Sequence, residues 1–177
     1  MKFTDYNHDV EKELIGRARE LQPLLRKHAP EFDAQRRITP EVFKELTEAG
    51  FWDMASPRRW GGLGTSATTM ARVGAELGKG DPSVGWVYTV LHGTTWVASL
   101  GPDELQEELF GNGKHPTICG AVTPPGSAQE VEGGYIVNGK WAYCSGSRNA
   151  DWGQFGCNIV KEDGTVEAWG DSRYGGS

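Results

Sequence analysis

The sequence predicts an α+β protein, in which an N-terminal all-α domain is followed by part of an antiparallel β domain. Up to about His115, apolar side chains recur at three- and four-residue steps between Gly and Pro residues, which is the period of amphipathic helices. After His115, short alternating segments are separated by turn residues such as Asn138-Gly139, a pattern typical of hairpins. We therefore expect a helical domain over residues 1–114 and a partial β domain over residues 115–177.

Local start and stop signals bound the expected helices. Pro is common at the first helical position and Gly just past the last one, and these residues bracket the segment from Thr39-Pro40 to Gly50. Pro30 is expected to close the first periodic segment, because Pro removes a hydrogen bond from a helix interior. The expected helical segments are 10–30, 39–50, 66 to 78 or 80, 81–99 and 102–110.

Turn residues divide the second half into four expected strands. Asn138-Gly139 has alternating residues on both sides, so it is the strongest hairpin signal in the chain. Further turns are expected at 132–134 and 162–164, and the last piece, 169–177, leaves the sheet unfinished. The expected strands are 117–122, 135–137, 140–144 and 154–160.

Composition and charge exclude several functional classes. A formal net charge of -6 argues against sequence-independent binding of nucleic acid, which needs a basic surface. The longest apolar run, from Val84 to Leu100, is broken by Gly, Thr and His residues, so we expect neither a membrane span nor a secretion signal. The three cysteines and four histidines do not cluster, which predicts a reduced, cytoplasmic protein without a bound metal.

Four short motifs follow one another along the chain: PRRWGGLG at 57–64, DPSV at 81–84, VTPPGS at 122–127 and KWAYCSG at 140–146. Their order resembles the acyl-CoA dehydrogenase superfamily, in which the last two motifs correspond to flavin-contacting loops. The first of these loops lacks the acidic form usual in the dehydrogenases. The second has the pattern WxYxSG and is followed by NADW at 149–152. This combination resembles the oxygenase components of two-component flavin-dependent monooxygenases, the branch that hydroxylates phenols.

The resemblance implies a mechanism and a set of partners. Reduced FMN or FAD would come from a separate flavin reductase, and one oxygen atom of O2 would pass to a small aromatic substrate. No Gly-x-Gly-x-x-Gly fingerprint is present, which is consistent with an enzyme that does not bind NADH itself. The full-length family forms homo-oligomers, commonly tetramers, and continues into a C-terminal helical bundle that is absent here. The resemblance therefore implies a truncated chain that is inactive by itself.

The flavin contacts implied by the resemblance lie in the two loops of the β half. Ser145 would lie close to flavin N5, which makes it a candidate catalytic residue. From the residues alone, an ordinary strand and turn is the favoured interpretation of segment 140–147, and a small packing residue that of Cys144; the order of the family motifs favours the flavin interpretation. The implied cofactor-binding residues are Val122, Thr123, Tyr143, Cys144, Ser145 and Gly146.

One face of the segment 81–99 carries the candidate substrate residues. Gly85, Thr89, His92 and Trp96 share this face in helical register. His92 is the second candidate catalytic residue, because an imidazole can accept a phenolic proton near neutral pH. A hydrogen-bonded core histidine is the alternative, and the residues leave both open. The predicted substrate-binding residues are Trp86, Thr89, His92 and Trp96.

Two other functions remain open at this point. An acyl-CoA dehydrogenase would need a C-terminal catalytic carboxylate and a thioester site, and the chain stops before either could occur. A non-catalytic truncated product, or a module that binds a partner, is the second alternative, and its support is the length of the chain.

Overall fold

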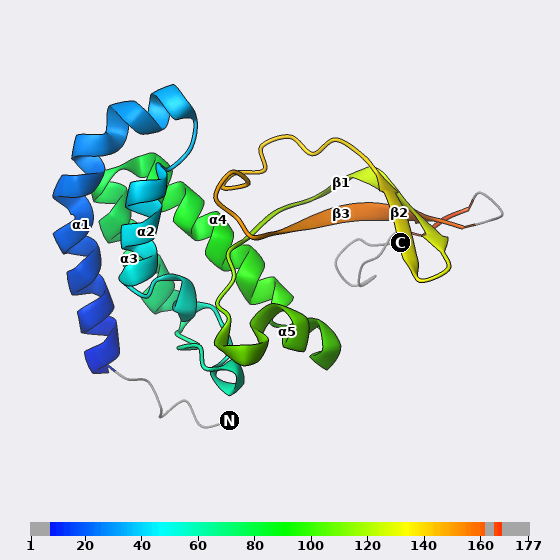
Figure 1. Cartoon of the computed structure of the whole chain (residues 1–177), viewed down its shortest axis with the longest axis horizontal. Coiled ribbons are helices and arrows are strands. Elements are labelled where there is room, and N and C mark those ends of the chain that lie inside the picture. The colour runs from blue at the N-terminus through cyan, green and yellow to red at the C-terminus, as the bar shows by residue number, and fades with distance from the viewer. Residues whose placement is uncertain (1–7, 162–164, 168–177) are drawn as a thin grey trace. The chain divides into compact units, whose positions relative to one another are not determined.

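The computed structural model of the chain describes residues 8–161 and 165–167. Its contacts divide the chain into two compact units. The first comprises the described part of Met1–Cys119 together with Ser145–Gly153, and it contains the helices coloured blue to green in Figure 1. The second comprises Gly120–Cys144 and the described part of Gln154–Ser177, and it is built from strands. The domain boundary expected between residues 114 and 115 stays a prediction.

The predicted succession of helices and then strands is confirmed. The helices are followed along the chain by a four-stranded sheet. The helices are α1 (His8–Gln35), α2 (Pro40–Glu48), α3 (Ala67–Gly80), α4 (Pro82–Ala98) and α5 (Asp103–Phe110), with short 3-10 turns η1 (Trp52–Met54), η2 (Arg58–Trp60) and η3 (Gly111–Gly113). The strands are β1 (Ile118–Val131), β2 (Gly134–Asn138), β3 (Trp152–Val160) and β4 (Val166–Glu167).

Helix α1 is longer than predicted. It continues through Pro23 and Pro30 to Gln35, so the end expected at Pro30 was wrong. A Pro inside a helix costs about 3 kcal/mol. Phe32 lies beyond Pro30 and is buried in the core. Burying a Phe side chain contributes about 1.5–3 kcal/mol, so tertiary packing offsets much of the local cost.

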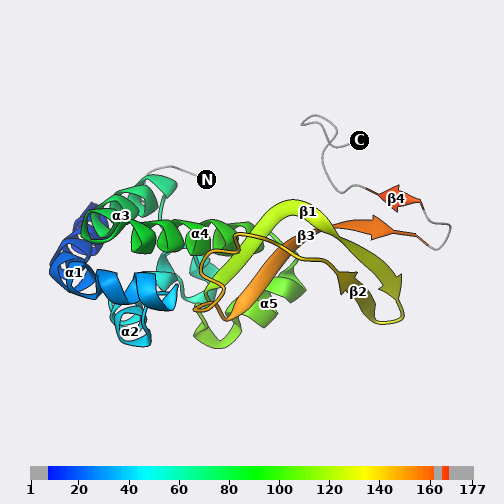
Figure 2. The same ribbon diagram turned by 90° about the horizontal axis from the view of Figure 1, so that it is seen from above.

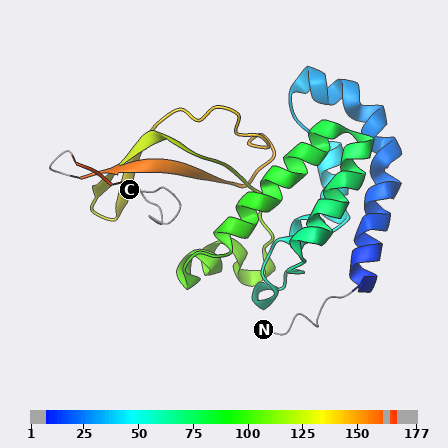
Figure 3. The same cartoon turned by 180° about the vertical axis from the view of Figure 1, so that it is seen from behind.

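Helices α1, α3 and α4 form the centre of the first unit and lie side by side in Figure 3. Helices α3 and α4 approach each other closely where Gly85 of α4 faces α3, because a Cβ at Gly85 would lie 2.8 Å from the Cα of Gly78. Buried apolar side chains from all three helices fill the space between them. The principal ones are Leu14, Leu25, Val73, Leu77, Val84, Tyr88 and Leu91.

A buried carboxylate joins α1 to α3. Glu76 Oε1 accepts hydrogen bonds from Arg19 Nη2 at 3.1 Å and from Lys79 Nζ at 2.9 Å, and Oε2 accepts one from Gln22 Nε2 at 3.0 Å. The hydrogen bond from Arg19, followed by that from Lys79, lowers the pKa of Glu76 to about 2. The two helices are therefore held by a charged contact as well as by apolar burial.

Segment 145–153 lies against the helices although it follows the first two strands in sequence. Arg148 Nη1 donates to Gln35 O at 3.0 Å, and Asn149 Nδ2 donates to Ile38 O at 3.1 Å. Asp151 Oδ2 accepts from both the backbone N–H and the hydroxyl of Thr117, each at 2.9 Å. These long-range bonds fix the backbone immediately after the predicted flavin loop.

The second unit is a sheet with strand order β2-β1-β3-β4. Strands β1 and β2 form the antiparallel hairpin seen in Figure 2. Val131 pairs with Gly134 in this hairpin, and β3 and β4 are also antiparallel. The turn expected at 132–134 is thus confirmed, and Gly133 adopts the positive φ of 83° that this turn uses. Strand β1 is longer than expected because it continues through 122–127 to pair with β2.

The hairpin predicted at Asn138-Gly139 was wrong, and so was the strand at 140–144. Residues 139–151 contain no strand, and Gly139 lacks the positive φ that a type I′ turn needs. The side chain of Trp141 explains this. Its Nε1 donates to Gly156 O of β3 at 2.9 Å, and its ring lies 4.9 Å from that of Phe155. The chain after β2 therefore crosses the sheet and contacts it through an indole rather than a backbone ladder.

Two further predictions lie outside the described residues: the turn at 162–164 and the final piece at 169–177. None of the helices within residues 8–161 and 165–167 combines the length and apolar character needed to cross a membrane. Over the same residues, no group of three or more His, Cys, Asp or Glu side chains could hold a metal ion.

Candidate functional site

Helix α4 positions the predicted substrate residues, and its start is fixed by the DPSV motif. Asp81 Oδ1 accepts hydrogen bonds from the backbone N–H groups of Ser83 at 2.9 Å and Val84 at 3.0 Å, which satisfies two donors of the first turn. Pro82 occupies the first helical position, where a missing N–H costs nothing. The motif therefore fixes the residue at which α4 begins.

An apolar pocket of about 340 Å³ lies between α3 and α4. Three of the four predicted substrate residues, Thr89, His92 and Trp96, line it from α4. Helix α3 contributes Met70 and two small alanines, which leave room between the helices. A largely apolar pocket with a few polar groups is the usual form of a small-molecule site. The complete lining is Thr65, Ala67, Met70, Ala71, Tyr88, Thr89, His92, Gly93 and Trp96.

His92 is tied to the backbone at both ring nitrogens. It is only 4% exposed, with Nδ1 2.9 Å from Tyr88 O and Nε2 2.8 Å from Phe51 O. Burial lowers its pKa, while the two carbonyl groups act in the opposite direction. A neutral imidazole has one N–H, so it donates to only one of these carbonyls. Proton exchange with a ligand therefore requires the ring to leave one backbone contact, and the catalytic role of His92 stays a prediction.

The structure brings Ser145 to α4, where it meets Trp86. Trp86 Nε1 donates to Ser145 Oγ at 3.0 Å. Trp86 is 60% exposed and does not line the pocket between α3 and α4, so it is separated from the other predicted substrate residues. A Cβ at Gly146, where φ is 83°, would lie 2.9 Å from Leu91 Cδ2, so the Ser-Gly tip packs directly on the helix.

Sequence reasoning did not find this contact, since 59 residues separate Trp86 from Ser145. The glycine after Ser145 was the available signal, because a small residue permits close backbone approach. It did not indicate which helix would be approached.

The other predicted cofactor residues belong to the second unit, and most of them are exposed. Val122 is 88% exposed and Tyr143 is 97% exposed. Thr123 is exposed as well, and Cys144 is a half-buried free thiol. Tyr143 has a φ of 56°, an uncommon conformation for a residue other than Gly that is often found at functional sites. The side chains of Val122 and Tyr143 thus present apolar and aromatic surface to solvent.

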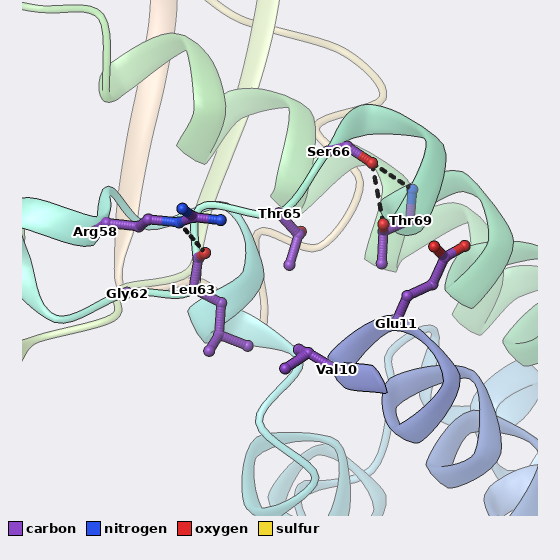
Figure 4. A pocket seen from close by; sticks show the side chains of 8 residues that line it. All are labelled: Val10, Glu11, Arg58, Gly62, Leu63, Thr65, Ser66 and Thr69. Carbon is purple, nitrogen blue, oxygen red and sulfur yellow. Dashed lines mark hydrogen bonds between the residues drawn. The ribbon is translucent and has the colours of Figure 1, made fainter. Parts of the chain in front are cut away.

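A second pocket, of about 400 Å³, is lined by part of the PRRWGGLG loop, by the segment that leads into α3 and by the start of α1 (Figure 4). Its polar groups hold the loop and the start of α3. Arg58 Nε donates to Leu63 O at 3.1 Å, and Ser66 Oγ accepts from the backbone N–H of Thr69 at 3.1 Å. Glu11 is buried on the opposite side from Arg58 and forms an ion pair with Arg72.

The glycines of this motif are required by the backbone conformation of the loop. A Cβ at Gly62 would lie 2.2 Å from Ser56 O, and Gly61 has a φ of 90°. Only a residue without a side chain fits either position without strain. The motif is therefore explained by the turn that leads into α3.

Comparisons with known proteins identify the family to which this fold belongs. The family model for the N-terminal domain of acyl-CoA dehydrogenases matches residues 10–111, which include every helix of the first unit from Val10 onward. The chain belongs to this family. The resemblance predicted from the four motifs is thereby confirmed.

Relatives that match the chain in sequence include flavin-dependent oxygenases. The oxygenase subunit HsaA of a flavin-dependent monooxygenase from Rhodococcus jostii is 33% identical over 147 residues, which cover 83% of this chain and 38% of that protein. The oxygenase component of an FADH(2)-dependent resorcinol hydroxylase from a Rhizobium species is 31% identical, with 78% of this chain and 34% of that protein covered. The chain thus spans less than two fifths of the length of these relatives.

Solved structures of other proteins are also similar to this chain. The crystal structure of a 3-HSA hydroxylase from a Rhodococcus species has a TM-score of 0.81 at 32% identity and covers 87% of this chain and 40% of that one. XiaF from a Streptomyces species, solved with FADH2 and glycerol, has a TM-score of 0.84 at 23% identity over 92% of this chain and 45% of that one, which supports the fold alone.

Proposed function

We propose that the chain acts in the oxygenase component of a two-component flavin-dependent monooxygenase, which hydroxylates an aromatic, phenolic substrate with reduced flavin and O2. The observation that carries the proposal is the apolar pocket between α3 and α4, lined by Thr89, His92 and Trp96 within a family domain. The names of the relatives support the same reaction class, since they include a resorcinol hydroxylase and indole-3-acetate monooxygenases. These names favour a monooxygenase over an acyl-CoA dehydrogenase.

We propose that reduced FMN or FAD contacts the residues of the two motif loops. The bound flavin would supply the activation of O2. Tyr143 offers an exposed ring on which a flat, partly polar group can stack, and Val122 offers exposed apolar surface. The hydroxyl of Ser145 is held by the indole N–H of Trp86, so its oxygen has a fixed position. The proposed contacts are Val122, Thr123, Tyr143, Cys144, Ser145 and Gly146.

The chain's own residues would then do three things. Ser145 Oγ would hold the proton at flavin N5, and Trp86 would keep the hydroxyl in place. Thr89 and Trp96 would orient the aromatic ring in the pocket. His92 would accept the phenolic proton at the nitrogen that leaves its backbone carbonyl, because an electron-rich phenolate is the better acceptor of oxygen. The apolar side chains of α3 and α4 would limit access of water.

The remaining parts of the proposal concern partners and location. A flavin reductase would deliver the reduced cofactor, and the protein would assemble as a homo-oligomer, which the resemblance implies to be a tetramer at full length. We also propose a cytoplasmic location, where reduced flavin and free thiols persist.

Nuclear magnetic resonance of the isotopically labelled 177-residue chain tests the proposal. Anaerobic titration with reduced FMN or FAD is expected to shift the resonances of Tyr143, Ser145 and Gly146, whereas phenol is expected to shift those of Thr89, His92 and the Trp96 indole. NADH serves as the control ligand and should shift neither set. If millimolar reduced flavin and phenol leave both sets unchanged in the folded chain, the proposed function is wrong.

A further inference from the structure

The polar side chains that line the pocket between α3 and α4 have their donors directed into the protein. Thr89 Oγ1 donates to Gly85 O at 2.9 Å, and Thr65 Oγ1 donates to Met54 O at 3.1 Å. The hydroxyl of Tyr88 points to the sulfur of Met54 at 3.4 Å. A hydroxyl that has given its proton to the backbone keeps two lone pairs, so it can act only as an acceptor toward a ligand.

His92 follows the same pattern. Whichever ring nitrogen carries the proton in the neutral form, it donates to a backbone carbonyl, because Tyr88 O and Phe51 O occupy both nitrogen directions. The ring therefore offers no N–H to a pocket ligand in this arrangement. The indole N–H of Trp96 is the exception, since no hydrogen bond is formed by it within the described residues and the side chain is 52% exposed at the pocket rim.

The pocket also lacks charge. Among its nine lining residues there is no Lys, Arg, Asp or Glu. A carboxylate or phosphate placed in it would be desolvated and would find only the Trp96 donor, which is unfavourable for an anion. The lining thus disfavours anionic ligands, and apart from Trp96 it offers little to ligands that present only acceptors.

We propose that Thr89 is a specificity-determining residue, whose Oγ1 accepts a hydrogen bond from an O–H or N–H group on a neutral aromatic ligand. This inference rests on the proposed function, because it assigns the substrate chemistry of the same pocket. Thr89 is the exposed threonine on the pocket face of α4, so its lone pairs are accessible, whereas Thr65 is half-buried. The ligand class is a flat, uncharged ring with one hydrogen-bond donor, which includes phenols and indoles with a free N–H.

Two matched pairs of ring compounds test the inference on the full chain. Phenol is compared with anisole, and indole with N-methylindole, because each pair differs mainly in the donor. Dissociation constants are measured by nuclear magnetic resonance titration of the Trp96 indole signal, with benzoate as the anionic probe. We expect the donor-bearing member to bind about 3- to 10-fold more tightly, which is the worth of one neutral hydrogen bond. Benzoate should give no saturable shift.

Thr89→Val should abolish this preference, because Val keeps the shape of Thr without its oxygen. Thr68→Val is the matched control, since Thr68 is exposed on α3 and does not line the pocket. The control should keep the preference. Equal binding within each pair, a preference that survives Thr89→Val, or saturable benzoate binding would overturn the inference while the proposed function stands. If none of the ring compounds binds to the folded chain, the inference and the proposed function are both wrong.

Discussion

The close approach of α3 and α4 can be tested by adding one methyl group at Gly85. A Cβ there would lie 2.8 Å from Gly78 Cα, 3.0 Å from Gly78 N and 3.2 Å from Gly74 O. The shortest of these distances is about 0.6 Å below the onset of ordinary van der Waals contact in a close-packed interior. All three atoms belong to the backbone of α3, which cannot rotate away. Gly85→Ala is therefore expected to push the two helices apart beside the pocket.

Two opposing contributions determine how much Gly85→Ala changes the free energy of unfolding. Ala is favoured over Gly in a helix interior by about 1 kcal/mol. Forcing an extra methyl into a packed interface costs about 1–3 kcal/mol. The free energy of unfolding should therefore fall by about 0–2 kcal/mol for Gly85→Ala. Gly93→Ala is the matched control on the same helix, because a Cβ there meets nothing within 4 Å. The control should stabilise the protein by about 0.5–1 kcal/mol.

Urea unfolding followed by far-ultraviolet circular dichroism measures both variants. The difference between them should equal the packing term alone, about 1–3 kcal/mol, because the helix-propensity gain is common to both. In a domain of this size that difference corresponds to a melting temperature lower by about 2–4 °C per kcal/mol in the Gly85 variant. If Gly85→Ala stabilises the protein as much as Gly93→Ala, the helices do not touch at Gly85 and the reasoning is refuted.

Three further predictions follow from single contacts. The pKa of Glu76 is lowered from 4.5 to about 2 in the folded state, so its contribution to stability is present above pH 4.5 and is lost as the pH falls toward 2. The stability difference between the native protein and Glu76→Gln should shrink over that range, and a constant difference in pH-dependent urea unfolding would contradict this. His92→Ala should lower the free energy of unfolding by about 1–3 kcal/mol, because it removes the buried ring that contacts Phe51 O and leaves that carbonyl with the N–H of Met54 as its remaining donor; an unchanged urea midpoint would show that the carbonyl contact is unimportant. In the proposed monooxygenase, Ser145→Ala and Trp86→Phe should both raise the release of hydrogen peroxide relative to hydroxylated product while flavin affinity is retained, and an unchanged coupling ratio in both would remove this pair from the site.

Much of the helical half could be predicted because its signals are local. The start of α4 follows from Asp81 and Pro82, whose side chains act on the next few backbone groups. The end of α1 could not be predicted in this way. It depends on tertiary packing, including the burial of Phe32, which offsets much of the local cost of Pro30.

The β half shows the same division at its two turns. Glu132-Gly133 and Asn138-Gly139 both have turn chemistry, and only the first closes a hairpin. The second closes no hairpin, because the chain after it is held by the indole of Trp141, which donates a hydrogen bond to Gly156 O of β3. A choice between two locally acceptable turns is decided by pairing and packing partners elsewhere in the chain. Periodicity over a few residues cannot contain that information.

The candidate site divides along the same line. Helical spacing alone places Thr89, His92 and Trp96 on one face of α4, because residues three and four apart lie together. The surroundings of that face depend on tertiary packing, which supplies the small side chains of α3 beside the pocket and the two backbone carbonyls that contact the nitrogens of His92. Tertiary packing also places the indole of Trp86 where it donates a hydrogen bond to Ser145 and does not line the pocket. The reason is physical, because helix register is fixed by bonds between near neighbours, whereas the partner of an exposed side chain is fixed by how the whole chain packs.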